Sequence, residues 1–122
     1  IRDAVEDDNF LVMYHNCGNV EPLLPQICQV NASSYSFGNA STSKKALQAL
    51  PADRLVIGNI DPAGTLRNGT PDMVREETRA LLERCSKYPN FVIASGCDVP
   101  PQTPFENMDA FFETVEEFYK EA

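Results

Sequence analysis

Four short runs rich in β-branched and aromatic residues alternate with helical patterns, and this alternation constrains the fold more than any other feature of the sequence. The runs span residues 10–14, 34–37, 55–58 and 91–94. Most are continuously apolar, which predicts strands buried on both faces. A repeated strand–helix order predicts parallel strands joined by right-handed crossovers. The 122 residues are therefore expected to form a single α/β domain over 1–122.

The clearest helix is predicted near the carboxyl terminus. Thr103 and Glu106 have the spacing of a capping box, and Pro104 suits a first helical turn. Residues spaced three and four apart then form one apolar stripe: Met108, Phe111, Phe112, Val115, Phe118 and Tyr119. This pattern predicts an amphipathic helix that packs on the sheet.

Three further helices are expected between the strands. The longest opens at Thr70-Pro71. Its inward-facing residues are predicted to be Val74, Leu81, Leu82, Cys85 and Tyr88. A shorter helix follows Ser43 and ends at Pro51, whereas the one after Asn19 is expected to be delayed or kinked because Pro25 lacks a backbone donor.

This order fits both a doubly wound sheet and half of a (β/α)8 TIM barrel, and hydrophobic patterning does not choose between them. Polar residues follow three of the strands, at 15–19, 59–61 and 97–98. Barrel active sites are built from residues at the carboxyl ends of the strands. The placement of these residues favours a (βα)4 half-barrel.

One imidazole and two thiols fall at predicted strand ends. His15 and Cys17 are two residues apart, so on an extended backbone their side chains point to the same side, while Cys97 must arrive by folding. Nitrogen and sulfur ligands suit zinc, and a three-ligand site leaves a position open for chemistry. Taken singly, such a histidine is usually a hydrogen-bonded structural residue, and buried cysteine is commonly a small hydrophobe. Together they favour a metal site.

The other two cysteines, Cys28 and Cys85, lie on helical patterns among apolar neighbours, where cysteine simply packs. Four cysteines in a secreted chain could pair as two disulfides, but βα order at this length favours reduced thiols and a cytoplasmic location. The predicted metal site therefore uses Cys17 and Cys97 only.

Asp61 and Asn59 end the third strand, and Asn19 follows the first. Asp61 is the candidate catalytic residue, as a ligand-orienting group or a hydrogen-bond partner of a metal-bound imidazole. The alternative is that Asp61-Pro62 only starts a turn. Asn19 and Asn59 are the candidate cofactor-binding residues. The glycines do not form a phosphate-cradling motif, so nucleotide binding is not expected.

Charge and hydropathy exclude two classes of partner. The chain has 10 basic and 18 acidic residues, a net charge of −8, with the basic residues scattered. Nucleic acids and anionic membrane surfaces are therefore poor partners, and no apolar run approaches the ~20 residues that cross a bilayer. Because the chain begins at Ile1 with an acidic stretch over 3–8, it is expected to be a fragment of a longer protein.

Three motifs in order resemble the C-terminal half of the uroporphyrinogen decarboxylase superfamily. They are His15-Asn16-Cys17-Gly18-Asn19, Gly58-Asn59-Ile60-Asp61-Pro62, and Gly96-Cys97-Asp98-Val99-Pro100 followed by Thr103-Pro104-Phe105-Glu106-Asn107. The likeness covers nearly the whole chain. It implies a (β/α)8 barrel in which the predicted strands are strands five to eight.

Within that superfamily the metal-free decarboxylases carry a Gly-His-Gly-type motif where this chain has Gly96-Cys97-Asp98. The His-X-Cys motif and distant cysteine are similar to those of the corrinoid-dependent methyltransferases, whose zinc holds a thiol substrate. This resemblance implies zinc on His15, Cys17 and Cys97, and a thiol that attacks the methyl group of a methyl-corrinoid. The corrinoid is expected on a partner protein, because the only histidine is already a proposed zinc ligand.

Two alternatives stay open. One is a carboxy-lyase of the uroporphyrinogen decarboxylase type that acts on a tetrapyrrole without a metal. The other is a non-catalytic half-barrel that binds a metal or a partner. Whichever function holds, the two outer strands of a half-barrel lack neighbours, so the isolated chain is expected to self-associate.

Overall fold

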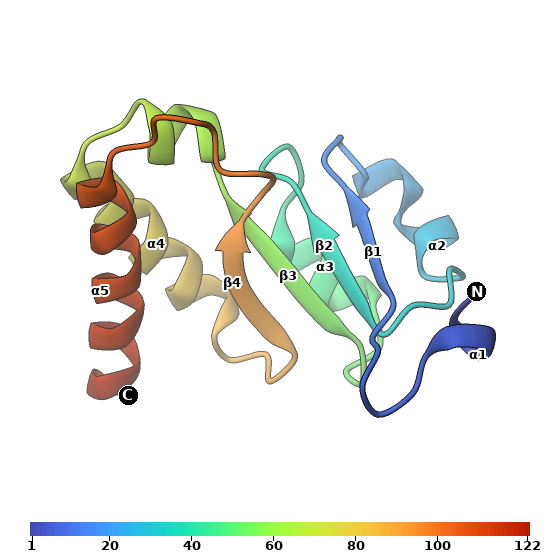
Figure 1. The fold of residues 1–122 in the computed structure, drawn as a ribbon. Coiled ribbons are helices and arrows are strands. Elements are labelled where there is room, and N and C mark those ends of the chain that lie inside the picture. Colours follow the sequence, from blue (N-terminus) through green and yellow to red (C-terminus); the bar gives the residue numbers. More distant parts are fainter.

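The computed structural model describes residues 1–122 and contains one four-stranded sheet (Figure 1). Its strands are β1 (Met13–Asn16), β2 (Ser34–Phe37), β3 (Leu55–Ile60) and β4 (Phe91–Ser95). They lie in sequence order and each neighbouring pair is parallel. A doubly wound sheet reverses its strand order at a switch point, whereas a barrel half does not. The predicted α/β half-barrel is confirmed.

The first strand begins later than its hydrophobic run predicts. Phe10 and Leu11 are more than half exposed, and β1 starts only at Met13. Immediately before it, the Val12 amide donates to a Glu6 carboxylate oxygen at 3.0 Å instead of to a neighbouring strand. The other three strands start where predicted, and β3 and β4 continue slightly further.

Burial on both faces, predicted for most of the strands, is found only in β2. In β3 burial alternates: Val56 and Ile60 are fully buried while Leu55 is exposed. The prediction is wrong for β1, β3 and β4 because the helices cover one face of the sheet, and the opposite face is only partly covered in this half-barrel (Figure 1).

Two helices cover that face close to their predicted positions. α3 (Ser43–Ala49) ends before Pro51, and α4 (Pro71–Cys85) is capped by the Thr70 hydroxyl, which accepts from the Met73 amide. The predicted inward residues of α4 between Val74 and Cys85 are buried, and Tyr88 packs against the core. The helical periodicity therefore identified the core face of α4 correctly.

The last helix, α5 (Phe105–Glu121), packs mainly against α4 beside the edge of the sheet (Figure 1). The predicted capping box is wrong, because the Thr103 hydroxyl donates to the Pro100 carbonyl instead of accepting from the helix. The predicted apolar stripe is partly wrong. Its buried seam is Asn107, Ala110, Phe111 and Thr114, whereas Phe112 and Tyr119 are exposed. Small residues predominate in this seam because a helix–helix contact brings the two backbones close together.

The remaining elements are short. α1 (Arg2–Val5) was not predicted from the sequence. The interrupted helix expected near Pro25 is a 3₁₀ turn, η1 (Glu21–Leu23), continued by one α-helical turn, α2 (Leu24–Ile27), and a π-helical turn, η2 (Pro62–Arg67), follows β3. None of the helices combines the length and the apolarity needed to cross a membrane.

Candidate metal centre

The structure brings His15, Cys17 and Cys97 together at the carboxyl end of the sheet. Their ligand atoms all lie within 4.8 Å of one another. His15 Nε2 lies 2.7 Å from Cys17 Sγ, and Cys17 Sγ lies 3.0 Å from Cys97 Sγ. All three residues that the sequence singles out as metal ligands therefore share one site.

Glycines allow the two outer strands to supply ligands to one point, although β2 and β3 separate them. A Cβ on Gly38, just after β2, would lie 2.6 Å from the Cys17 carbonyl oxygen. A Cβ on Gly96, just before Cys97, would lie 2.7 Å from the Asn39 amide nitrogen. Atoms cannot approach so closely, so only glycine permits the strand ends to pack there. The loop after β4 thereby reaches across β3 to the loop after β2.

The imidazole of His15 is oriented by a residue that the sequence analysis missed. His15 Nδ1 lies 2.9 Å from the Ser36 hydroxyl, and the two residues are paired in register on β1 and β2. This hydrogen bond leaves Nε2 facing Cys17 Sγ. The only sequence signal was a serine within a strand whose register was unknown, so the pairing became visible only in the folded sheet.

The electrostatics of the site favour a cation. The hydrogen bond that Cys17 donates to Cys97 raises the pKa of the Cys17 thiol. Burial and the negative charges of Cys97 and Asp98 act in the same direction. Two thiolates beside a carboxylate would repel one another, and a divalent cation between the sulfurs would relieve that repulsion.

The donor set also fits zinc. Imidazole nitrogen and thiolate sulfur are its preferred protein ligands, and around a tetrahedral ion such atoms lie about 3.5 Å apart. The His15–Cys17 and Cys17–Cys97 contacts are somewhat shorter than this, and the 4.8 Å within which all three ligand atoms lie is longer. Small side-chain movements would therefore suffice to hold the ion.

Asp61 performs the turn chemistry that was the alternative to a catalytic role. Its Oδ1 accepts hydrogen bonds from the amides of Ala63 at 3.0 Å and Gly64 at 2.9 Å, which starts the π-helical turn. The residue that orients the His15 imidazole is Ser36, not Asp61. A catalytic role for Asp61 stays a prediction.

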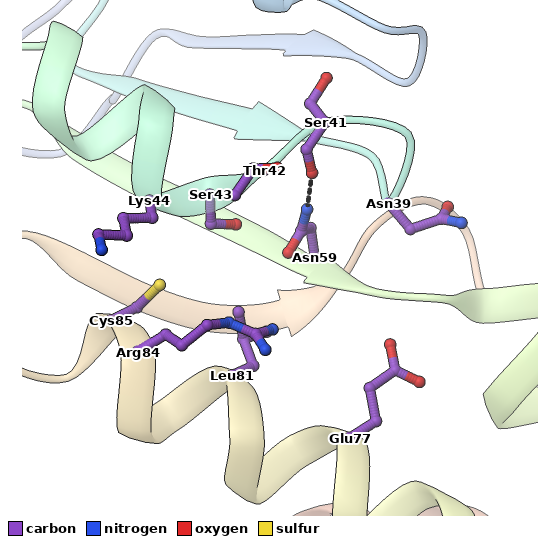
Figure 2. Close-up of a pocket in the computed structure, with 10 residues that line it drawn as sticks. All are labelled: Asn39, Ser41, Thr42, Ser43, Lys44, Asn59, Glu77, Leu81, Arg84 and Cys85. Atoms are coloured by element: carbon purple, nitrogen blue, oxygen red, sulfur yellow. Dashed lines mark hydrogen bonds between the residues drawn. The ribbon is translucent and has the colours of Figure 1, made fainter.

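The two predicted cofactor-binding amides have different surroundings. The Asn19 side chain accepts from the Glu21 amide at 3.2 Å, next to the metal centre in sequence. The Asn59 side chain donates to the carbonyls of Gly38 and Ser41, and lines a cavity among the helices (Figure 2). Asn59 therefore supports the loop that contains Gly38, and a cofactor role for either amide stays a prediction.

The other two cysteines lie outside the metal centre, as predicted. Cys85 is buried in the core, and Cys28 donates to the Ala49 carbonyl at 3.4 Å. All four cysteines are free thiols. The difference in environment supports metal binding by Cys17 and Cys97 and packing by Cys28 and Cys85.

Comparison with known proteins supports the resemblance noted in the motifs. A family model described as "Uroporphyrinogen decarboxylase (URO-D)" matches residues 1–118. The chain is 30% identical over 116 residues to "Methylcobamide:CoM methyltransferase MtaA" of Methanosarcina barkeri, covering 91% of this chain and 32% of that protein. It is 29% identical over 103 residues to "Methylated-thiol--coenzyme M methyltransferase" of Methanosarcina mazei, covering 84% and 27%.

Structural comparison agrees. A solved structure described as "methyltransferase from Methanosarcina mazei" matches 91% of this chain and 32% of its own length, with a TM-score of 0.78 and 29% identity. The chain thus spans about a third of the length of these relatives. Both the fold and nearly the whole sequence match one family. The chain belongs to the uroporphyrinogen decarboxylase (URO-D) family.

Proposed function

We propose that the protein containing this chain is a zinc-dependent methyltransferase that moves a methyl group from a methyl-corrinoid protein to a small thiol. The convergence of His15, Cys17 and Cys97 at the carboxyl face of the half-barrel carries this proposal. The relatives named as methylcobamide:CoM and methylated-thiol–coenzyme M methyltransferases support the classes of methyl donor and acceptor.

Each residue of the centre has a defined part. His15 can offer the lone pair of Nε2 to a metal only if its Nδ1 carries the proton. In that tautomer Nδ1–H donates a hydrogen bond to the Ser36 hydroxyl, which lies 2.9 Å away. Cys17 and Cys97 lose their protons when they bind the metal. Three protein ligands leave one position for the substrate sulfur. Zinc, when bound there, supplies Lewis-acid chemistry that keeps a thiol deprotonated near neutral pH.

The neighbouring polar residues are proposed to serve substrate and corrinoid. Asn19 follows Cys17 closely and still has its amide nitrogen free for a cofactor contact, since its oxygen accepts from Glu21. Asn59 would act on the metal centre indirectly, because its side chain holds the loop that contains Gly38. Asp61 would orient the substrate with the carboxylate oxygen that its turn leaves free.

The corrinoid is proposed to arrive on a partner protein, because this chain has one histidine and the metal centre uses it. A cytoplasmic location is proposed from the free thiols, since reduced cysteines persist in that compartment. Nucleic acid is not a proposed partner of a chain with a net charge of −8.

The decisive experiment measures methyl transfer by the full-length protein from methylcobalamin to a small thiol under anaerobic conditions. Demethylation of the corrinoid is followed by its absorbance. We expect the rate to require zinc and to fall at least a hundredfold in His15→Ala, while the Cys28→Ser control keeps wild-type activity. Unchanged activity after metal removal would refute the proposal, and metal-independent decarboxylation of a tetrapyrrole would establish the carboxy-lyase alternative.

A further inference from the structure

A polar cavity of about 410 Å³ lies between α3, α4 and the end of β3 (Figure 2). None of the three metal-centre residues lines it. Only two of its ten lining residues, Leu81 and Cys85, are hydrophobic. The polar groups that matter for recognition are Ser43, Lys44, Asn59, Glu77 and Arg84. The cavity is therefore a second candidate site, on the helix-covered side of the sheet.

Two basic side chains that line the cavity have no ion-pair partner. Lys44 and Arg84 take part in none of the ion pairs of the structure, although the chain has a large acidic excess. Arg84 extends from α4 along the wall facing Ser43 and Asn59, whereas the Lys44 ammonium is turned away from these groups (Figure 2). The only carboxylate of the lining, Glu77, already accepts a hydrogen bond from the Asp61 amide at 3.1 Å. The lining thus carries a net positive charge.

A buried hydroxyl faces the same space without a partner. Ser43 is 2% exposed, and its Oγ makes no hydrogen bond within the protein. Of the four buried side-chain atoms without a partner, it is the one whose residue lines this cavity. Buried hydroxyls are nearly always hydrogen-bonded in folded proteins. An oxygen-rich ligand in the cavity would supply the missing partner.

The positive charges also act in the interior wall of the cavity. Burial raises the pKa of the Cys85 thiol, and the charges of Arg84, Lys44 and Lys87 oppose that rise. The positive charges of Arg84 and Lys44 therefore stabilise negative charge at the cavity wall, and would do the same for a bound anion.

We propose that this cavity binds the phosphate group of a small phosphate ester, through the guanidinium of Arg84 and the hydroxyl of Ser43, with Lys44 adding positive charge at a greater distance. A guanidinium matches two phosphate oxygens at once, and a hydroxyl donates one further hydrogen bond. The volume exceeds that of a phosphate group and leaves room for the ester. The Asn59 oxygen and Glu77 can accept hydrogen bonds from hydroxyls on that part. This phosphate site is separate from the metal centre at which methyl transfer is proposed.

The test is isothermal titration of the full-length protein with inorganic phosphate, glycerol phosphate and acetate at low ionic strength. We expect saturable binding of both phosphates at one site per chain and weaker binding as salt is added. Arg84→Gln should weaken binding at least tenfold, and Ser43→Ala about threefold, because a charged donor contributes more than a neutral hydroxyl.

Arg75→Gln is the matched control. It removes the same charge from the same helix, but Arg75 pairs with Asp72 and Glu113 outside the cavity, so binding should be unchanged. Equal weakening by Arg75→Gln and Arg84→Gln would reveal a diffuse charge effect and overturn the site. Absence of saturation would overturn it as well, and acetate binding as tight as that of phosphate would overturn the assignment to a phosphate group.

Discussion

Cys17 Sγ and Cys97 Sγ lie 3.0 Å apart, although 80 residues separate them in the sequence and two strands separate theirs in the sheet. Their contact exists only because the carboxyl end of the sheet curves. Gly38 and Gly96 lie at points where the strand ends approach one another closely. The metal centre therefore depends on the curvature of the half-barrel as much as on its ligands.

Removal of either kind of ligand should remove the metal. We expect about one zinc per chain in the full-length protein, and loss of that zinc in His15→Ala and Cys97→Ser, because the donors of the site are one imidazole and two thiolates. Cys28→Ser and Cys85→Ser should keep the metal at a modest cost in stability from altered packing. Metal analysis of the purified variants checks this, and equal zinc loss in all four would point to a different site.

Ser36 should contribute to zinc affinity without touching the ion. Ser36→Ala removes the hydrogen bond to His15 Nδ1 and is expected to weaken zinc binding about tenfold to a hundredfold, as loss of such partners does elsewhere. Ser36→Thr, which keeps a hydroxyl, should restore part of the affinity. Competition with a chelator measures it.

The control for that experiment lies two residues earlier on β2. Ser34 is fully buried and its hydroxyl has no partner, so Ser34→Ala should leave zinc affinity unchanged. A similar loss in both serine variants would indicate a general packing effect and would remove Ser36 from the site.

Close backbone approach at Gly38 predicts a stability effect. In Gly38→Ala the new Cβ would lie 2.6 Å from the Cys17 carbonyl oxygen, so the free energy of unfolding should fall by about 1–3 kcal/mol and zinc affinity should fall with it. Gly18→Ala is the control, since its Cβ would meet only the Asn16 side chain at 3.3 Å. Chemical unfolding and zinc titration of both variants test this; equal effects would contradict it.

Low pH should weaken the hydrogen bonds that hold the residues before β1 to the rest of the fold. The Glu6 carboxylate accepts from Ser33, from the Val12 amide and from Arg2, which lowers its pKa from 4.5 to about 2. Because the folded-state pKa is lower than the unfolded one, this stabilisation is fully present above about pH 4.5 and is lost as the pH falls toward 2.

Glu6→Gln removes that titration, so the variant should lose less stability than the wild type between about pH 4.5 and 2. Urea unfolding across this range measures the difference. Asp53→Asn, which removes an exposed carboxylate, controls for net charge. Identical pH dependence of the wild type and the Glu6 variant would show that the carboxylate contributes nothing.

The isolated 122-residue chain should self-associate. β1 pairs only with β2 and β4 only with β3, so both sheet edges are bare. We expect oligomers in which half-barrels pair, and weaker zinc binding than in the full-length protein. Light scattering and zinc titration on both proteins test this. A monodisperse monomer with full affinity would mean that these strands form an independent domain.

Much of the fold followed from local sequence. Short runs rich in β-branched and aromatic residues located three of the four strands, and helical periodicity identified the core face of α4, because both signals come from residues close together in the chain. The metal-ligand residues were also found this way: His15 and Cys17 form a local pair, and Cys97 lies at the end of a predicted strand. The strand positions, the core face of α4 and the candidate ligands can all be identified from residue type and from spacing along the chain.

The tertiary structure decided the rest. It delayed β1 through the hydrogen bond from Val12 to Glu6, and set α5 against α4 so that Phe112 is exposed. It also paired Ser36 with His15 and turned Asn59 toward the cavity among the helices. These outcomes depend on strand register and on close approach of distant backbones. Such contacts form only when separate segments meet, and residue spacing within one segment carries no information about them.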